Sequence, residues 1–141
     1  MSTDPRREAA ENLETTRRVR EVTQALMVRM PEGDVVPTLD RVARCMELLG
    51  DPQRTYRVVH LTGTNGKTST TRMVERILRE TGLRTGRFTS PHLHDPLERI
   101  SIDGAPIDPR HFLEVWDDVA PFIAIVDAES EAAGGPPLSY F

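Results

Sequence analysis

Apolar residues recur at helical spacing in two stretches near the start of the chain. The first predicts a helix from about Glu8 to Met30, with an aliphatic face made of Val19, Val22, Leu26 and Met30. The second follows Thr38, a residue type that caps helix N-termini, and ends at Gly50. Cys45 lies beside the apolar stripe of this second helix, so we expect it to fill the core rather than act as a nucleophile.

The pattern then changes to that of a strand, a loop and a helix. Tyr56–Thr62 is mostly apolar and β-branched, which predicts a strand. After a glycine-containing loop, apolar positions return at helical spacing, at Val74, Ile77, Leu78 and Thr81. The opposite face of this helix is charged, through Arg72, Glu75, Arg76 and Arg79. Gly82 ends the helix and Thr85–Thr89 is predicted to form a second strand, so this unit predicts a parallel sheet.

A hairpin and a long helix are predicted in the remainder of the chain. The stretch 99–102 alternates into the turn pair Asp103-Gly104, and 105–107 returns as the second strand. Asp108 as N-cap and Pro109 at the first position open a helix with an apolar stripe, made of Phe112, Val115, Trp116, Val119, Ile123 and Val126. Pro121 is expected to kink or split this helix.

These elements predict an α/β fold: a P-loop-type parallel sheet with flanking helices, an N-terminal helical segment and a small β-hairpin. We divide the chain into an N-terminal helix over 1–33, a βαβ unit over 56–90, a loop and hairpin over 91–107 and a helix over 108–131. A doubly wound sheet needs more parallel strands than these to cover both its faces. We therefore expect residues 1–141 to be a truncated, N-terminal part of an ATP-binding domain, without a C-terminal domain.

Composition narrows the function classes. The chain has 141 residues, of which 38% are hydrophobic and 28% charged, as is usual for one soluble globular domain. The formal charge of -4 gives no basic footprint, which disfavours a nucleic-acid partner. The sequence has neither a long apolar run nor a signal-peptide pattern, so we expect a cytoplasmic protein with no membrane partner.

The loop between the predicted strand and helix is the main candidate for chemistry. It reads G-T-N-G-K-T-S, and its candidate phosphate-binding residues are Gly63, Thr64, Asn65, Gly66, Lys67, Thr68 and Ser69. The glycines allow backbone amides to approach phosphate oxygens, while Lys67 would contact the β- and γ-phosphates and Thr68 would hold Mg²⁺. This is a shortened form of the phosphate loop. An ordinary glycine turn is the alternative, but the strand and helix on either side favour phosphate binding.

Four motifs together resemble the folylpolyglutamate synthase family, which is often bifunctional with dihydrofolate synthase and belongs to the Mur ligase superfamily. They are G-T-N-G-K-T-S from Gly63, F-T-S-P-H-L from Phe88, E-R-I from Glu98 and I-D-G-A-P-I from Ile102. The resemblance implies an ATP-dependent ligase that joins L-glutamate to dihydropteroate or a folate through an acyl phosphate. It further implies ATP and Mg²⁺ as cofactors, small-molecule substrates and a monomeric enzyme.

The resemblance also implies roles for individual residues. Lys67 would be catalytic, and Ser90 would join Thr68 as a Mg²⁺ ligand, although a strand-ending turn is the alternative for Ser90-Pro91. The candidate substrate contacts are Asp34, Val35, Pro91, His92 and Arg99. The family's usual residues are not reproduced at Asp34 and Val35. Glu98 and Arg99 are alternatively a solvated charge pair.

The spacing of His92 and His94 suggests a metal pair, but no third ligand is nearby in the sequence. We therefore expect these histidines to shape the loop over the substrate.

Two alternatives remain open. The residues after Lys67 resemble those of cell-wall amino-acid ligases of the same superfamily. Those enzymes, however, carry a uridine-nucleotide-binding domain before the phosphate loop, and here only 62 residues precede Gly63. The second alternative is an inactive nucleotide-binding fragment, because the family's remaining Mg²⁺ ligands and its C-terminal domain would lie beyond Phe141.

Overall fold

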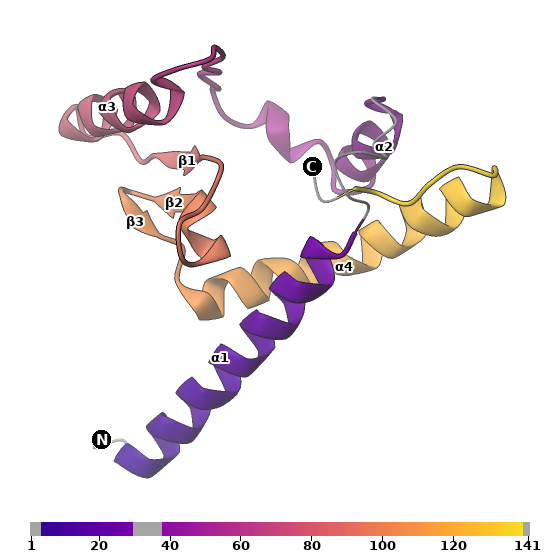
Figure 1. Cartoon of the computed structure of the whole chain (residues 1–141), viewed down its shortest axis with the longest axis horizontal. Coiled ribbons are helices and arrows are strands. Elements are labelled where there is room, and N and C mark those ends of the chain that lie inside the picture. Colours follow the sequence, from indigo (N-terminus) through magenta and orange to yellow (C-terminus); the bar gives the residue numbers. More distant parts are fainter. Residues whose placement is uncertain (1–3, 30–37, 140–141) are drawn as a thin grey trace. The chain divides into compact units, whose positions relative to one another are not determined.

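The structure is a computed structural model that describes residues 4–29 and 38–139 (Figure 1). The helices of this part are α1 (Pro5–Met27), α2 (Asp40–Leu48), α3 (Lys67–Glu80) and α4 (Pro109–Ala132), with short 3₁₀ helices η2 (Pro52–Arg54) and η3 (Pro96–Arg99). The strands are β1 (Gly86–Phe88), β2 (Ile100–Ile102) and β3 (Ala105–Pro106). This mixture of helices and sheet confirms the predicted α/β class.

The described residues divide into two compact units. One is drawn from Met1–Arg57 and Phe112–Phe141, and we call it the helical unit. The other is formed by Val58–His111, and we call it the strand unit. The candidate phosphate loop and the sheet both belong to the strand unit, so this unit positions the site.

Local capping starts the two helices at the beginning of the chain. Asp4 accepts a hydrogen bond from the amide of Arg6 at 3.0 Å, and Pro5 occupies the first helical position, so α1 begins slightly earlier than predicted. The hydroxyl of Thr38 accepts a hydrogen bond from the amide of Asp40 at 3.2 Å. The N-cap of α2 is nevertheless Leu39, which makes no side-chain capping bond, so the predicted N-cap at Thr38 lies one residue too early.

The helical unit buries apolar residues and places charge pairs between its helices. Its buried apolar residues are Val22, Cys45, Leu113 and Val126. Its ion pairs between helices are Arg18–Asp117 at 2.7 Å and Arg44–Glu129 at 3.0 Å, and Arg29, two residues after the end of α1, pairs with Asp127. Burial raises the pKa of the Cys45 thiol, and the nearby Asp127 charge adds to this effect. A buried thiol of this kind fits the predicted role as core filler.

α4 is one continuous helix. Asp108 accepts hydrogen bonds from the amides of Arg110 at 2.9 Å and His111 at 3.1 Å, which confirms the predicted N-cap. Pro121 lies inside the helix and does not split it. The predicted apolar stripe is buried at Val126 but 43% exposed at Val115. None of the described helices is both long and apolar enough to cross a membrane.

The sheet is antiparallel in the order β1-β2-β3, whereas the sequence predicted a parallel sheet. Its hairpin was predicted correctly: Asp103 and Gly104 have φ angles of +49° and +82°, as an Asp-Gly hairpin turn requires. The Asp103 carboxylate also accepts a hydrogen bond from the amide of Thr85 at 2.8 Å. This bond ties the turn to the start of β1.

The predicted strand over residues 56–62 is wrong. These residues are all described, and none of them is in a strand. Val58 and Val59 are 68% and 61% exposed. A β-branched run becomes a strand only where a neighbour accepts its backbone hydrogen bonds, and β1 pairs instead with β2. Within the described residues, 56–62 therefore has strand propensity without a partner strand.

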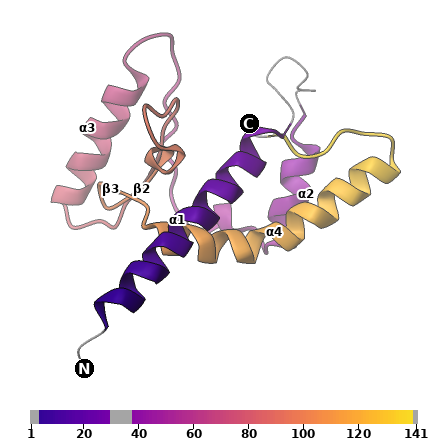
Figure 2. The same cartoon turned by 60° about the horizontal axis from the view of Figure 1, so that its bottom comes forward.

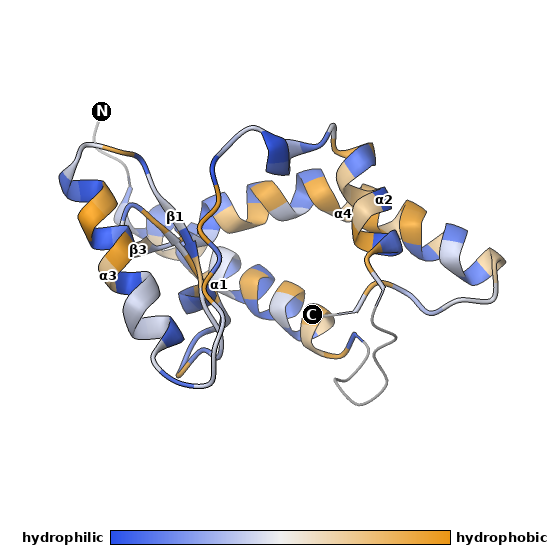
Figure 3. Ribbon diagram, turned by 90° about the horizontal axis from the view of Figure 1, so that it is seen from above, coloured by the Kyte–Doolittle hydropathy of each residue, from blue (hydrophilic) through white to orange (hydrophobic). Residues whose placement is uncertain are grey.

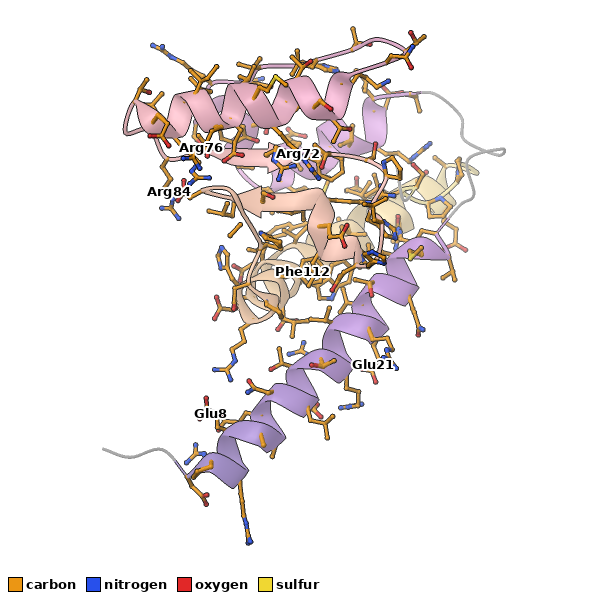
Figure 4. All side chains as sticks on the ribbon, turned by 60° about the vertical axis from the view of Figure 1, so that its left-hand side comes forward. Glu8, Glu21, Arg72, Arg76, Arg84 and Phe112 are labelled. Atoms are coloured by element: carbon orange, nitrogen blue, oxygen red, sulfur yellow. The ribbon has the colours of Figure 1, made fainter. Side chains whose placement is uncertain are left out.

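α3 buries one residue of its charged face, Glu75, against the strand segment, whereas the sequence predicted that this face is exposed. Glu75 is buried, at 8% exposed, whereas Met73 and Ile77 are each 64% exposed. Arg72 and Arg76, labelled on α3 in Figure 4, are exposed, and Figure 3 shows hydrophobic and hydrophilic positions alternating along this helix. The strands offer polar side chains to this face, and Glu75 is hydrogen-bonded by Thr85. A buried carboxylate is tolerated because it finds such partners.

The hairpin turn lies close to α3. A Cβ atom at Gly104 would lie 1.6 Å from Nη1 of Arg79, which itself lies 3.6 Å from Glu75 Oε1. Gly104 therefore combines a positive φ with a close approach by the Arg79 side chain.

Candidate functional site

The phosphate loop connects the 56–62 segment to α3, and Figure 2 shows the chain reversing direction before this helix. Gly63 and Gly66 have φ angles of +141° and +75°. These values favour glycine, although a Cβ atom at either position would meet nothing within 4 Å. The two glycines are therefore required by backbone conformation, and the space around them is open enough for a ligand to approach.

Lys67 lies over this loop. Its ammonium group donates a hydrogen bond to the carbonyl oxygen of Gly63. Lys67 is also the one lysine of the sequence, which otherwise takes all its positive side chains from arginine. The lysine head group and the loop backbone are thus brought together, as binding of phosphate oxygens requires.

The N-terminus of α3 is suited to an anion. Gly66 is its N-cap, and no described side chain caps the helix there. The first turn carries hydroxyl residues and no acidic one. The amides of this turn and the helix dipole therefore favour negative charge beside Lys67, with Thr68 half-buried and Thr64, Asn65 and Ser69 exposed. These residues fit a nucleotide phosphate chain.

Ser90 lies two residues after the end of β1. It is exposed, whereas its neighbour Thr89 is buried and donates its amide to the carbonyl of Arg99 at 2.9 Å. The Ser90–Pro91 peptide bond is cis. In the described part of the chain, no hydrogen bond or ion pair joins Ser90 or Pro91 to the phosphate loop. Within the same residues there is also no group of three or more His, Cys, Asp and Glu side chains that could hold a metal ion.

Glu98 organises the loop between β1 and β2. Its carboxylate accepts hydrogen bonds from the amides of Leu93 at 3.0 Å, His94 at 3.2 Å and Asp95 at 3.1 Å. These bonds, with that from Leu93 contributing most, hold the pKa of Glu98 below its ordinary value. The Asp95 carboxylate accepts from the amide of Leu97 at 2.8 Å, which completes a capping box on η3. The spacing Asp-x-x-Glu in the sequence is the signal that could have revealed this role.

The structure brings together two of the predicted substrate residues. Arg99 Nε donates a hydrogen bond to Nδ1 of His92 at 2.9 Å. His92 is half-buried, and His94 is exposed. The pairing makes Nδ1 of His92 an acceptor and orients its ring. Asp34 and Val35, the other predicted contacts besides Pro91, lie outside the described residues.

The chain is similar to folate ligases in sequence. It is 46% identical over 124 residues to the dihydrofolate synthase/folylpolyglutamate synthase of Mycobacterium tuberculosis, and the match covers 86% of this chain and 26% of that protein. With the enzyme of the same name from Bacillus subtilis it shares 37% identity over 93 residues, covering 66% of this chain and 22% of the relative. No protein-family model matches the chain.

The fold is also similar to solved folylpolyglutamate synthases. The Mycobacterium tuberculosis enzyme, complexed with ADP and AMPPCP, matches 90% of this chain and 27% of its own with a TM-score of 0.82 and 42% identity. A folylpolyglutamate synthase in an AMPPCP-folate complex matches 87% of this chain and 29% of its own with a TM-score of 0.71 and 28% identity. The chain is therefore similar in sequence and fold to part of the folylpolyglutamate and dihydrofolate synthases, and it spans about a quarter of the length of these relatives.

Proposed function

We propose that this chain is the phosphate-binding part of an ATP-dependent ligase that adds L-glutamate to dihydropteroate, to folates or to both. The observation that carries the proposal is the phosphate loop, where Lys67 bonds Gly63 beside an uncapped helix N-terminus, in a chain 46% identical to a named dihydrofolate/folylpolyglutamate synthase. An AMPPCP-folate complex of a relative with the same fold supports both substrate classes.

The reaction needs charge stabilisation more than covalent help from the protein. Transfer of the γ-phosphoryl group of ATP to the substrate carboxylate gives an acyl phosphate, and the glutamate amine then attacks its carbonyl carbon and releases phosphate. Lys67 and the amides of the loop would hold the transferring phosphoryl group and offset its growing negative charge. Mg²⁺, when bound, would neutralise further phosphate charge, with Thr68 and Ser90 as the ligands from this chain.

The loop after Ser90 is proposed to face the pterin-containing substrate. Glu98 orders this loop through its three amide contacts, and Arg99 orients His92. Its proposed substrate contacts are Pro91, His92 and Arg99, and we propose Asp34 and Val35 as further substrate contacts. Arginine suits this role because the substrate ends in a carboxylate.

The same proposal also assigns a role to each part of the chain and a class to the whole protein. The chain would be the N-terminal part of the ligase's ATP-binding domain, with the helix over 1–33, the phosphate-loop unit over 56–90, the substrate loop and hairpin over 91–107 and the helix over 108–131. We propose a cytoplasmic, monomeric enzyme that acts on small molecules, without a nucleic-acid or membrane partner.

The test measures ADP formation by the protein that carries this chain, with MgATP, L-glutamate and either dihydropteroate or a tetrahydrofolate. We expect ADP formation to require L-glutamate together with one of the two pterin-containing substrates. Lys67→Ala should lower the rate about 100-fold. Arg76→Ala is the matched control, because this exposed cation of the same helix pairs with Glu80. Full turnover by Lys67→Ala, or turnover only with a cell-wall peptide acceptor, would contradict the proposal.

A further inference from the structure

A buried polar contact joins the two segments that carry the candidate phosphate and metal ligands. Glu75 lies about two turns along α3 from Lys67. Arg87 lies in β1, three residues before Ser90. The Glu75–Arg87 pair is therefore a direct link, within the strand unit, between the phosphate-loop helix and the strand that leads to Ser90.

The carboxylate of Glu75 has partners on three sides. Thr85 Oγ1 donates a hydrogen bond to Glu75 Oε1 at 3.1 Å. Arg87 Nε lies 3.5 Å from Glu75 Oε2, and Arg79 Nη1 lies 3.6 Å from Oε1. The side chains of Arg87 and Glu75 are only 9% and 10% exposed, so water screens this charge pair weakly.

The two Nη nitrogens of the Arg87 guanidinium donate hydrogen bonds to side chains in and next to the sheet. Nη2 donates to Ser101 Oγ at 2.7 Å and Nη1 donates to Thr89 Oγ1 at 3.2 Å. Among the described residues, Nε finds no hydrogen-bond acceptor although it is buried, and Glu75 is its charged neighbour. The bonds to Thr89 and Ser101 thus fix the position of the planar Arg87 guanidinium, and its charge attracts Glu75, and with it α3, toward β1.

Stability alone does not explain this contact. Well-packed apolar residues in place of a buried ion pair are often equally stabilising or more so. An apolar contact, however, allows a helix to slide over a strand by fractions of an ångström. The hydrogen bond from Thr85 to Glu75 is directional and resists such sliding, and the bonds to Thr89 and Ser101 hold the Arg87 charge in place beside Glu75.

We propose that Glu75 and Arg87 are positioning residues, which hold Lys67 and Thr68 on α3 at a fixed distance from Ser90. The proposal rests on the function proposed above, since it concerns the same phosphate site. Rates of group transfer are sensitive to such placement, and a misplacement of about 1 Å can cost about 100-fold. Neither residue touches the substrate in this account; each acts through the element that carries it.

The test compares Glu75→Gln and Arg87→Lys with Glu80→Gln. Glu80 is the matched control, because it is an acidic residue of the same helix whose pair with Arg76 is 64% and 67% exposed. The primary readout is the ratio of the affinities for ATP and ADP, measured on one sample in the presence of Mg²⁺. The fraction of folded protein cancels from this ratio, so a variant that is merely less stable leaves it unchanged. The turnover number and KM for ATP are measured in parallel.

We expect Glu75→Gln to lower the ATP-to-ADP affinity ratio about fivefold and the turnover number about tenfold, with a smaller change in KM. Arg87→Lys keeps the positive charge but loses the planar guanidinium. Its affinity ratio and turnover number should therefore lie between those of Glu75→Gln and the parent. Glu80→Gln should match the parent. The double variant Glu75→Gln/Arg87→Met removes both charges; we expect it to regain thermal stability but not the affinity ratio.

Two outcomes overturn the inference, and they are distinguishable. If the parent protein binds ATP and Lys67→Ala does not, but Glu75→Gln and the double variant keep the parent's affinity ratio and turnover, then the pair is structural only and the proposed function stands. If the parent binds neither nucleotide, the proposed function itself falls, and the positioning role falls with it.

Discussion

The helical unit and the strand unit use the same kind of charge pair in opposite surroundings. In the helical unit, Arg18 and Asp117 bridge α1 and α4 while remaining 43% and 53% exposed, and the buried residues are mostly apolar. In the strand unit, Glu75 and Arg87 form a pair that is about one-tenth exposed. An exposed pair is easily replaced by water, whereas a buried one leaves an uncompensated charge when either partner is lost. The strand unit therefore depends on particular polar partners, and the helical unit on the volume of its apolar side chains.

The largest effect should come from leaving the Glu75 carboxylate without its buried partner. Arg87→Met should lower the free energy of unfolding by about 3–5 kcal/mol, because one charge of a buried pair is removed. Urea unfolding followed by circular dichroism measures the change. Arg76→Met, at an exposed pair of the same helix, should cost less than about 1 kcal/mol. Equal costs for the two variants would contradict the contrast between the units.

A cavity should be the most damaging change in the helical unit. Leu113 is 6% exposed, and Leu113→Ala should lower the free energy of unfolding by about 3 kcal/mol. Thermal unfolding of this variant is compared with that of Leu13→Ala, since Leu13 is 74% exposed on α1. A loss at Leu113 no greater than that at Leu13 would show that apolar packing does not dominate this unit.

The Arg29–Asp127 pair is an intermediate case, with side chains 23% and 24% exposed. Asp127 also accepts the amide of Leu138 at 2.7 Å, and Arg29 Nε donates to the carbonyl of Leu138 at 3.0 Å. Asp127→Asn keeps the shape but removes the charge, and should cost about 1.5 kcal/mol. Hydrogen exchange at the Leu138 amide should accelerate in this variant. Unchanged exchange there would mean that the carboxylate does not hold the segment after α4.

The smallest effect should be local and dependent on pH. The lowered pKa of Glu98 means that its carboxylate stabilises the folded loop above its ordinary pKa of about 4.5, and that this contribution is lost as pH falls through the lower folded-state value. After correction for intrinsic exchange, protection of the Leu93, His94 and Asp95 amides should therefore decrease with acidification. Glu98→Gln should show the weaker protection already at neutral pH. Protection that is the same in both proteins at pH 7 would rule out this role.

Elements whose signals are local could be predicted from the sequence. The cap at Asp108, the Asp103-Gly104 turn and the glycines of the phosphate loop each follow from the backbone preferences of one or two residues. The predicted strand over 56–62 failed because a strand depends on a partner that the run itself does not specify. β1 does form within the predicted Thr85–Thr89 stretch, but its neighbour β2 comes from the hairpin and runs antiparallel.

The orientation of α3 could not be predicted from periodicity. A hydropathy pattern treats every charged position as outward-facing, and so assigned Glu75 to solvent. Its burial depends on Thr85, Arg87 and Ser101, which approach it only in the folded chain. In the candidate site, too, only the contiguous signal could be predicted. The phosphate loop was recognisable as a contiguous motif, whereas the contact between His92 and Arg99 forms only when the loop between them folds.

Gly104 lies in an exposed turn, yet the Arg79 guanidinium occupies the space that its Cβ would need, and its φ is +82°. Alanine at this position would strain the backbone and displace a cation that neighbours Glu75. Any other residue at position 104 would carry the same backbone strain, although the turn is exposed. Solvent exposure would be a misleading guide for anyone choosing sites in this hairpin for labels, tags or surface redesign.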